Sequence, residues 1–391
     1  MANYAVMNPG KYHLGVPFNF PPLQNRRLNQ QYLIKNISWK TSTLIGRRLY
    51  VGNVQITDKD NKTRTLTDSI FKSKAGQFDV FTTDRRIDVA VGDGEDIVRL
   101  ASYADRLLQF KQNTLTIINA TKSDEMLEAT HRFKGVSHHN AVCETDYGVA
   151  WCNQHGVYLY NGRQVGELLM NEGVRFISES KWNAFYKDGE TMIGYVPQSR
   201  QLLLIKGVSG SNTGDIMVFD MVTSSWTEAT GRLGIEHKTN LVNMWDGKLI
   251  YGYESDTNEA TIKPWKSDCS IAIDNFKVQT KDMNFGNHAK KKITKVRITY
   301  KGASGGNINV LPKYIVDGGS TRHSFQDSNG SAITNIAGNA NWSEIELYTD
   351  TSIAGNVRSF AIELTDASGQ DVASDFEIND ITVIYRQKSV K

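Results

Sequence analysis

Cysteine is scarce in this chain, with three residues among 391, at positions 143, 152 and 269. An odd and low count excludes a disulfide scaffold and fits reduced thiols. The chain also lacks any apolar run of the ~18–20 residues that a spanning helix needs, and its mean hydropathy is -0.42. We therefore predict no membrane-spanning segment. The first ten residues show no secretory signal, so we expect a protein made and kept in a cytosol.

Proline is equally rare, and four of the seven prolines fall within the first 22 residues. Because proline blocks both helices and central strands, residues 1–35 are predicted to form an extended N-terminal arm. Such an arm cannot bury its own rings, so it lies either on its own domain or on a neighbouring subunit. The aromatic residues concerned are Tyr4, Tyr12, Phe18 and Phe20.

Neither sign of charge dominates, with 45 basic and 42 acidic residues and a net charge of +3. This balance excludes a polycation that would hold nucleic acid non-specifically. One basic run, residues 290–292 with Lys295 and Arg297, has two interpretations. It either meets phosphates in a channel or is a solvated strand end.

Short strands joined by tight turns dominate residues 36–270. Helical patterns are few, and the best candidates are 124–130 and 174–181. The predicted hairpins pair 107–110 with 115–118, 149–152 with 157–160, 202–205 with 216–219, and 248–251 with 260–262.

The spacing of these hairpins is the main evidence for the fold. Their second strands begin at Leu115, Val157, Ile216 and Ala260, in steps of 42, 59 and 44 residues. Two of the three steps match a propeller blade of about 40–50 residues, and an earlier hairpin at 49–66 supplies another blade. We predict a β-propeller of about five or six blades over residues 36–270. An irregular β-sandwich is the alternative.

Residues 271–391 have longer strands in which apolar and polar residues alternate cleanly. This alternation is typical of antiparallel strands with one buried and one wet face. We predict a jelly-roll-like β-sandwich, so the whole chain is all-β. The apolar faces are Val296, Ile298 and Tyr300, then Phe360, Ile362 and Leu364, and finally Ile381, Val383 and Tyr385.

Candidate chemical sites are weak. The best metal-like group contains His138, His139, Cys143, Cys152 and His155, but only Cys152 and His155 have the close spacing of structural zinc ligands. Since both cysteines stand in apolar strands, we expect them to be packing residues, with no tight zinc site.

No nucleotide-binding or catalytic motif is visible either. The acidic turn at 93–96 lacks the ligand spacing of a calcium loop, and the glycine-rich loop at 207–214 lacks the lysine of a phosphate-binding loop. The Asp-box of sialidase propellers is missing. We therefore predict no catalytic, cofactor-binding or metal-ligating residues, no cofactor, and no enzyme.

Three stretches carry a family resemblance. Residues 100–119 form a strand ending in Phe-Lys, a turn and an Ile-rich strand. Residues 135–162 add two Gly-Val strands ending in Asn161-Gly162, and residues 276–296 form a join between domains. Together they resemble the tail nozzle (tail tubular) proteins of short-tailed bacteriophages. Many of those proteins are longer and carry an extra platform domain, so this chain departs from the family in length.

The resemblance implies a virion structural protein in the distal tail tube, through which DNA is ejected. It implies a homo-oligomeric ring, a hexamer, below a tail adaptor and near tail fibres or tip proteins, with double-stranded DNA passing through. The expected location is the virion tail, assembled in the host cytoplasm. The alternative is a carbohydrate-binding or carbohydrate-cleaving protein, because propellers and sandwiches host both roles.

Overall fold

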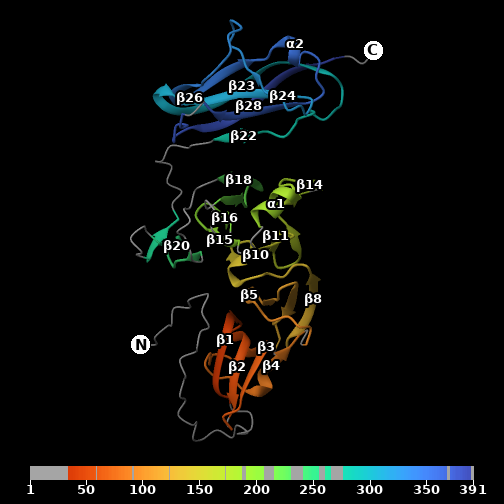
Figure 1. Cartoon of the computed structure of the whole chain (residues 1–391), viewed down its shortest axis with the longest axis vertical. Helices are drawn as coiled ribbons and strands as arrows, with labels where there is room; N and C mark the ends of the chain where they lie inside the picture. The colour runs from red at the N-terminus through yellow and green to blue at the C-terminus, as the bar shows by residue number, and fades with distance from the viewer. Residues whose placement is uncertain are drawn as a thin grey trace. The chain divides into compact units, whose positions relative to one another are not determined.

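The computed structural model describes residues 34–58, 60–89, 92–122, 124–171, 173–186, 191–206, 215–229, 241–254, 260–265, 276–367 and 370–388. The chain divides into two compact units, residues 1–265 and 266–391 (Figure 1). The predicted N-terminal arm falls almost wholly outside the described residues. Among the described residues, no helix is long and apolar enough to cross a membrane.

The described residues of the first unit form six antiparallel sheets, each built from strands consecutive in the chain. Five of them follow one another in a row, four with four strands and the last with three, and the sixth is a two-stranded ribbon of β13 (Met170–Asn171) and β14 (Val174–Arg175). The first sheet contains β1 (Ile34–Ile45), β2 (Arg48–Asp58), β3 (Thr63–Lys72) and β4 (Arg86–Asp88); the second β5 (Arg99–Tyr103), β6 (Arg106–Phe110), β7 (Thr114–Asn119) and β8 (Met126–Arg132); the third β9 (Val142–Thr145), β10 (Gly148–Asn153), β11 (Gly156–Tyr160) and β12 (Val165–Glu167); the fourth β15 (Met192–Val196), β16 (Gln201–Ile205), β17 (Ile216–Asp220) and β18 (Ser225–Ala229); the last β19 (Val242–Asn243), β20 (Leu249–Glu254) and β21 (Ala260–Pro264).

The predicted hairpins are confirmed. β6 pairs with β7, β10 with β11, β16 with β17 and β20 with β21. Strand β17 leads through a turn to β18, where Trp226 lies opposite Phe219. Their rings are 4.9 Å apart.

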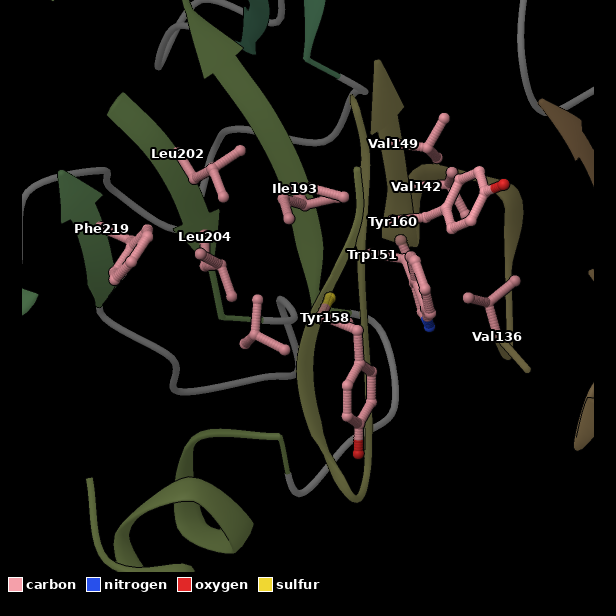
Figure 2. Close-up of a cluster of buried hydrophobic side chains, with 14 of the residues drawn as sticks. Val136, Val142, Val149, Trp151, Tyr158, Tyr160, Ile193, Leu202, Leu204 and Phe219 are labelled. Carbon is pink, nitrogen blue, oxygen red and sulfur yellow. The ribbon is translucent and has the colours of Figure 1, made fainter. Parts of the chain in front are cut away.

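Successive sheets pack face to face, as the blades of a propeller do. The first strand of each sheet contacts the first strand of the next. One core cluster joins the first and second sheets, a large one joins the second, third and fourth, and another joins the fourth and last. Figure 2 shows side chains of successive sheets gathered in the large cluster. No such cluster of described residues joins the first sheet to the last, so a closed ring of blades stays a prediction.

Two predicted helices are wrong in whole or in part. Of residues 124–130, those from 126 onward lie in strand β8, because pairing with β7 overrides the helix-favouring Met, Leu, Glu and Ala. In 174–181, residues Val174–Arg175 form β14, paired with β13 (Met170–Asn171). Helix α1 (Glu179–Phe185) begins only after Ser178, whose side chain accepts a hydrogen bond from the Lys181 amide. Short 3₁₀ turns occur at Thr83–Arg85 and His139–Ala141.

Strand β8 is the outer edge of the second sheet and carries exposed apolar side chains. Met126 and Leu127 are 61% and 59% exposed. The register shifts between Ile117 and Ile118, so β8 bulges near Glu128. Glu128 forms an ion pair with Arg106 of β6.

The second unit contains two antiparallel sheets that share one core cluster. Its predicted apolar faces are largely correct, since Val296, Ile298, Phe360, Ile362 and Leu364 are buried. The all-β class is confirmed, and the jelly-roll-like topology stays a prediction. One sheet has the order β22 (Lys277–Gln279), β27 (Phe360–Asp366), β24 (Val310–Val316) and β25 (His323–Ser324); the other has β26 (Ala337–Tyr348), β23 (Lys291–Asn307) and β28 (Glu377–Gln387), with the short helix α2 (Thr351–Ala354) after β26.

Candidate functional site

The cysteine and histidine group does not form a metal site in the described part of the chain, where no three His, Cys, Asp or Glu residues gather as a metal would need. Cys143 lies in β9 and Cys152 in β10, inside apolar strands as the sequence predicts. Burial raises the pKa of both thiols, which keeps them protonated. Neither is poised as a nucleophile or a metal ligand. Cys269 lies outside the described residues.

The acidic turn before β5 holds a neighbouring turn in place. Asp93 Oδ1 lies 2.7 Å from the buried ammonium of Lys111. The Glu95 carboxylate accepts hydrogen bonds from the Asn113 amide, its side chain and the Thr114 hydroxyl, at 3.2, 2.6 and 3.3 Å. These carboxylates are occupied by protein donors, so the turn has a structural role.

The structure contradicts both interpretations of the basic run for Lys291, its middle lysine. Lys291 is fully buried, and its ammonium donates to the carbonyls of Asn287, Ala289 and Arg358 at 2.7 to 3.2 Å. Lys295 and Arg297 contact the Glu346 carboxylate at 2.6 and 2.8 Å. Hydrogen bonds from Lys295 and Tyr348 lower the pKa of Glu346 to about 2. The Lys291 charge is therefore used inside the fold, while Lys295 and Arg297 are half-buried and paired with Glu346.

Carboxylates of the described residues show no sign of acid catalysis. A glycosidase acid needs a raised pKa beside a second carboxylate. Every described Asp or Glu with a shifted pKa has it lowered, as at Asp93, Asp220 and Glu363. Glu363 is almost fully buried, and Arg322 and Lys277 hold it from two sides at 2.7 and 3.0 Å.

Phe133 is the most unusual exposed residue. It follows β8 in the left-handed region, with φ of 62°, where a bulky side chain is rare and costs about 1–3 kcal/mol. The residue is nevertheless 62% exposed. Its ring meets the exposed His155 imidazole, with centroids 5.6 Å apart at 76°. A strained backbone that presents an aromatic residue to solvent makes this position a candidate binding site.

The segment that carries this ring is fixed at several points. The buried Asn153 side chain donates to the carbonyls of Phe133 and Gly135 at 3.1 and 2.9 Å. Its oxygen accepts from the His155 amide at 2.8 Å, so one residue positions both rings. Gly135 has no room for a Cβ atom, which would lie 2.3 Å from the Lys111 carbonyl. Phe133 is therefore held on a rigid support.

Basic residues flank Phe133 in the sequence. His131 and Arg132 precede it and Lys134 follows it, with the Lys134 ammonium 3.5 Å from the centre of the Tyr158 ring. In Figure 2 the Tyr158 hydroxyl points away from the other labelled side chains. We call Phe133, Gln154 and His155, with Arg132 and Lys134, the aromatic ledge. No sequence motif marks it, because a positive φ leaves no signal in the run Arg-Phe-Lys-Gly.

A second surface lies on the last sheet of the first unit. Leu249 and Tyr251 of β20 face the fourth sheet, while Val242, Ile250 and Ile262 lie on the opposite face by their register. Ile262 is 73% exposed. In the adjoining turn, Trp245 is 93% exposed. No hydrophobic cluster of the described residues covers this bare face.

His138 gives the first unit a pH dependence. Burial, with the nearby charge of His139, lowers the pKa of His138 from 6.5 to about 4. Between these values the unfolded chain binds a proton that the folded protein excludes. The contribution of His138 to the free energy of unfolding should thus be fully present above pH 6.5. About 2–3 kcal/mol should be lost as the pH drops from there through 4. Urea titrations across this pH range measure the free energy of unfolding. His138→Gln should flatten its dependence on pH, and the control His288→Gln, at an exposed histidine, should not.

No protein-family model matches the chain, and no curated protein sequence does. Solved structures with some likeness include an exo-β-1,3-galactanase from Phanerochaete chrysosporium, 10% identical over 88% of this chain and 95% of that one, with a TM-score of 0.31. A chain of a mitotic checkpoint complex is 14% identical over 61% and 79%, with a TM-score of 0.33. A Lactobacillus plantarum protein is 14% identical over 55% and 77%, with a TM-score of 0.27. Likenesses this distant carry no argument about function.

Proposed function

We propose that this chain is a structural subunit of a short-tailed phage tail, a nozzle protein that acts by assembly and not by catalysis. The family resemblance of residues 100–162 and 276–296 motivates the proposal. The observation that carries it is the bare apolar face of the last sheet, with Ile262 and the turn residue Trp245 open to solvent. The candidate reactive groups described above are buried or paired, which also favours assembly over chemistry.

Assembly is the simplest way to cover that face. Fully burying one large apolar side chain contributes about 1.5–3 kcal/mol, and tryptophan is a common anchor at subunit interfaces. A head-to-tail contact between copies builds a ring when the rotation closes. In the proposed hexamer the lumen passes double-stranded DNA, and the near-neutral net charge of +3 suits a wall that must release phosphates. The arm, residues 1–35, is a further proposed subunit contact.

Ile262→Glu and Trp245→Glu should each weaken subunit association by about tenfold or more, because a charge replaces an apolar anchor at the interface. Analytical ultracentrifugation of the full chain, with electron microscopy of the particles, measures the change. Val222→Glu is the matched control, since Val222 is 62% exposed in the turn between β17 and β18. It should assemble normally.

Two results would contradict this proposal. One is an unaltered chain that stays monomeric even with its neighbouring tail proteins. The other is an Ile262→Glu variant that forms the same rings as the unaltered protein. In the first case the nozzle function itself is wrong; in the second, the bare face is not the subunit contact.

Carbohydrate recognition is the second candidate function. The aromatic ledge favours it, because sugars present an apolar ring face that packs on an aromatic side chain while hydroxyl groups bond to polar neighbours. Carbohydrate cleavage is less favoured, since it needs an acid of raised pKa beside a second carboxylate.

A further inference from the structure

We propose that the aromatic ledge binds an acidic oligosaccharide, one whose sugar ring packs on Phe133 and whose carboxylate pairs with the basic residues around it. The inference rests on the second candidate function, carbohydrate recognition, and is independent of tail assembly. It assigns a ligand class to a surface outside the core and away from the bare face of the last sheet.

The first argument is the backbone of Phe133. An exposed phenylalanine at φ 62° contributes little to the core, yet Asn153 and the tight position of Gly135 hold it there. Asparagine or glycine would adopt the same backbone with less strain. A residue that is strained, exposed and rigidly supported is best explained by what its ring contacts outside the protein.

The second argument is shape and reach. His155 meets one part of the Phe133 ring and leaves most of it open. The exposed Gln154 amide stands beside the imidazole, 3.1 Å from Nε2, and supplies both a donor and an acceptor. A flat apolar surface with an amide and an imidazole at its rim fits a sugar ring with its hydroxyls better than a purely apolar partner.

The third argument is charge. Arg132 precedes Phe133 and Lys134 follows it, and the Arg132 side chain is exposed. Glu167 attracts the Lys134 ammonium, which packs on the Tyr158 ring. Arg132 therefore offers its charge to solvent beside Phe133, which favours a sugar bearing a carboxylate over a neutral one.

The test uses the full chain and saturation-transfer NMR with titration of three acidic probes: hyaluronan hexasaccharide, hexagalacturonate and α2,8-linked hexasialic acid. Chitohexaose is the neutral probe, and a DNA duplex is the competing polyanion. We expect at least one acidic probe to bind, and to bind more tightly than chitohexaose. Phe133→Asn should weaken it by about tenfold or more. Phe133→Tyr should retain binding, and Phe176→Asn, at an exposed phenylalanine elsewhere, should leave it unchanged.

Thermal unfolding separates this role from a structural one. Because Phe133→Asn relieves backbone strain at an exposed site, its unfolding midpoint should equal or exceed that of the unaltered protein. Binding of chitohexaose with equal or greater affinity overturns the acidic ligand class while carbohydrate recognition stands. Binding of none of the four oligosaccharides overturns both. Loss of folding or of oligomerisation in Phe133→Asn, or DNA binding that depends on Phe133 in place of sugar binding, overturns the inference as well.

Discussion

Replacing Trp151 with alanine should lower the free energy of unfolding of the first unit by about 3–5 kcal/mol. Trp151 is fully buried in β10, the strand at the centre of the large core cluster (Figure 2). Its ring lies 5.3 Å from that of Phe110 in the second sheet and 5.6 Å from that of Tyr158 in its own sheet. The cavity would therefore open where one sheet packs on the next, and the surrounding strands cannot close it fully.

Urea unfolding followed by far-ultraviolet circular dichroism measures this loss. Trp245→Ala is the matched control, because the same side chain is removed from a 93% exposed turn, and its stability should change by less than about 0.5 kcal/mol. Trp151→Phe should cost much less than alanine, since the buried indole N–H has no hydrogen-bond partner to lose among the described residues. Equal effects of Trp151→Ala and Trp245→Ala would show that the row of sheets does not depend on this core.

Replacing Lys291 with methionine should destabilise the second unit by about 3 kcal/mol or more, because hydrogen bonds to a charged group contribute about 1.5–3 kcal/mol each and the effects are not additive. Methionine keeps the volume of the side chain but leaves the carbonyls of Asn287, Ala289 and Arg358 without their donor. The three carbonyls come from the segment before β23 and from the loop before β27. The substitution should thus loosen the start of both strands.

Hydrogen exchange of the second unit measures where the opening occurs. Protection should fall first in β23 and β27. Lys290→Met is the control, since Lys290 is exposed and should leave both stability and exchange unchanged. A Lys291→Met variant as stable as the Lys290→Met variant would show that the buried ammonium contributes nothing.

The strands were predictable where a turn and two apolar segments agree. The hairpin of β10 and β11 follows from the apolar segments on either side of Asn153 and Gly156, and the structure pairs them in that register. Prediction failed where tertiary pairing opposed local preference. Residues 124–130 have a helix-favouring composition, yet pairing with β7 places those from 126 onward in β8.

The sites were less predictable than the strands. Lys291 stands in a run of three lysines. Nothing in the sequence indicates that the side chain of Lys291 is the one that is fully buried and bonded to three carbonyls. Phe133 carried no signal in the sequence, because backbone strain is a property of the folded turn. The pairing of Lys295 and Arg297 with Glu346 depends on β23 lying beside β26, which is a long-range contact.

The bulge in β8 has a consequence for behaviour at high concentration. An edge strand with exposed Met126 and Leu127 would otherwise be a template on which strands of other copies add, the first step of fibre growth. The shifted register breaks the regular spacing of its free amides and carbonyls, and the Arg106–Glu128 ion pair places charge beside the break. The bulge thereby disfavours an unwanted β-sheet contact between copies of the chain at high concentration.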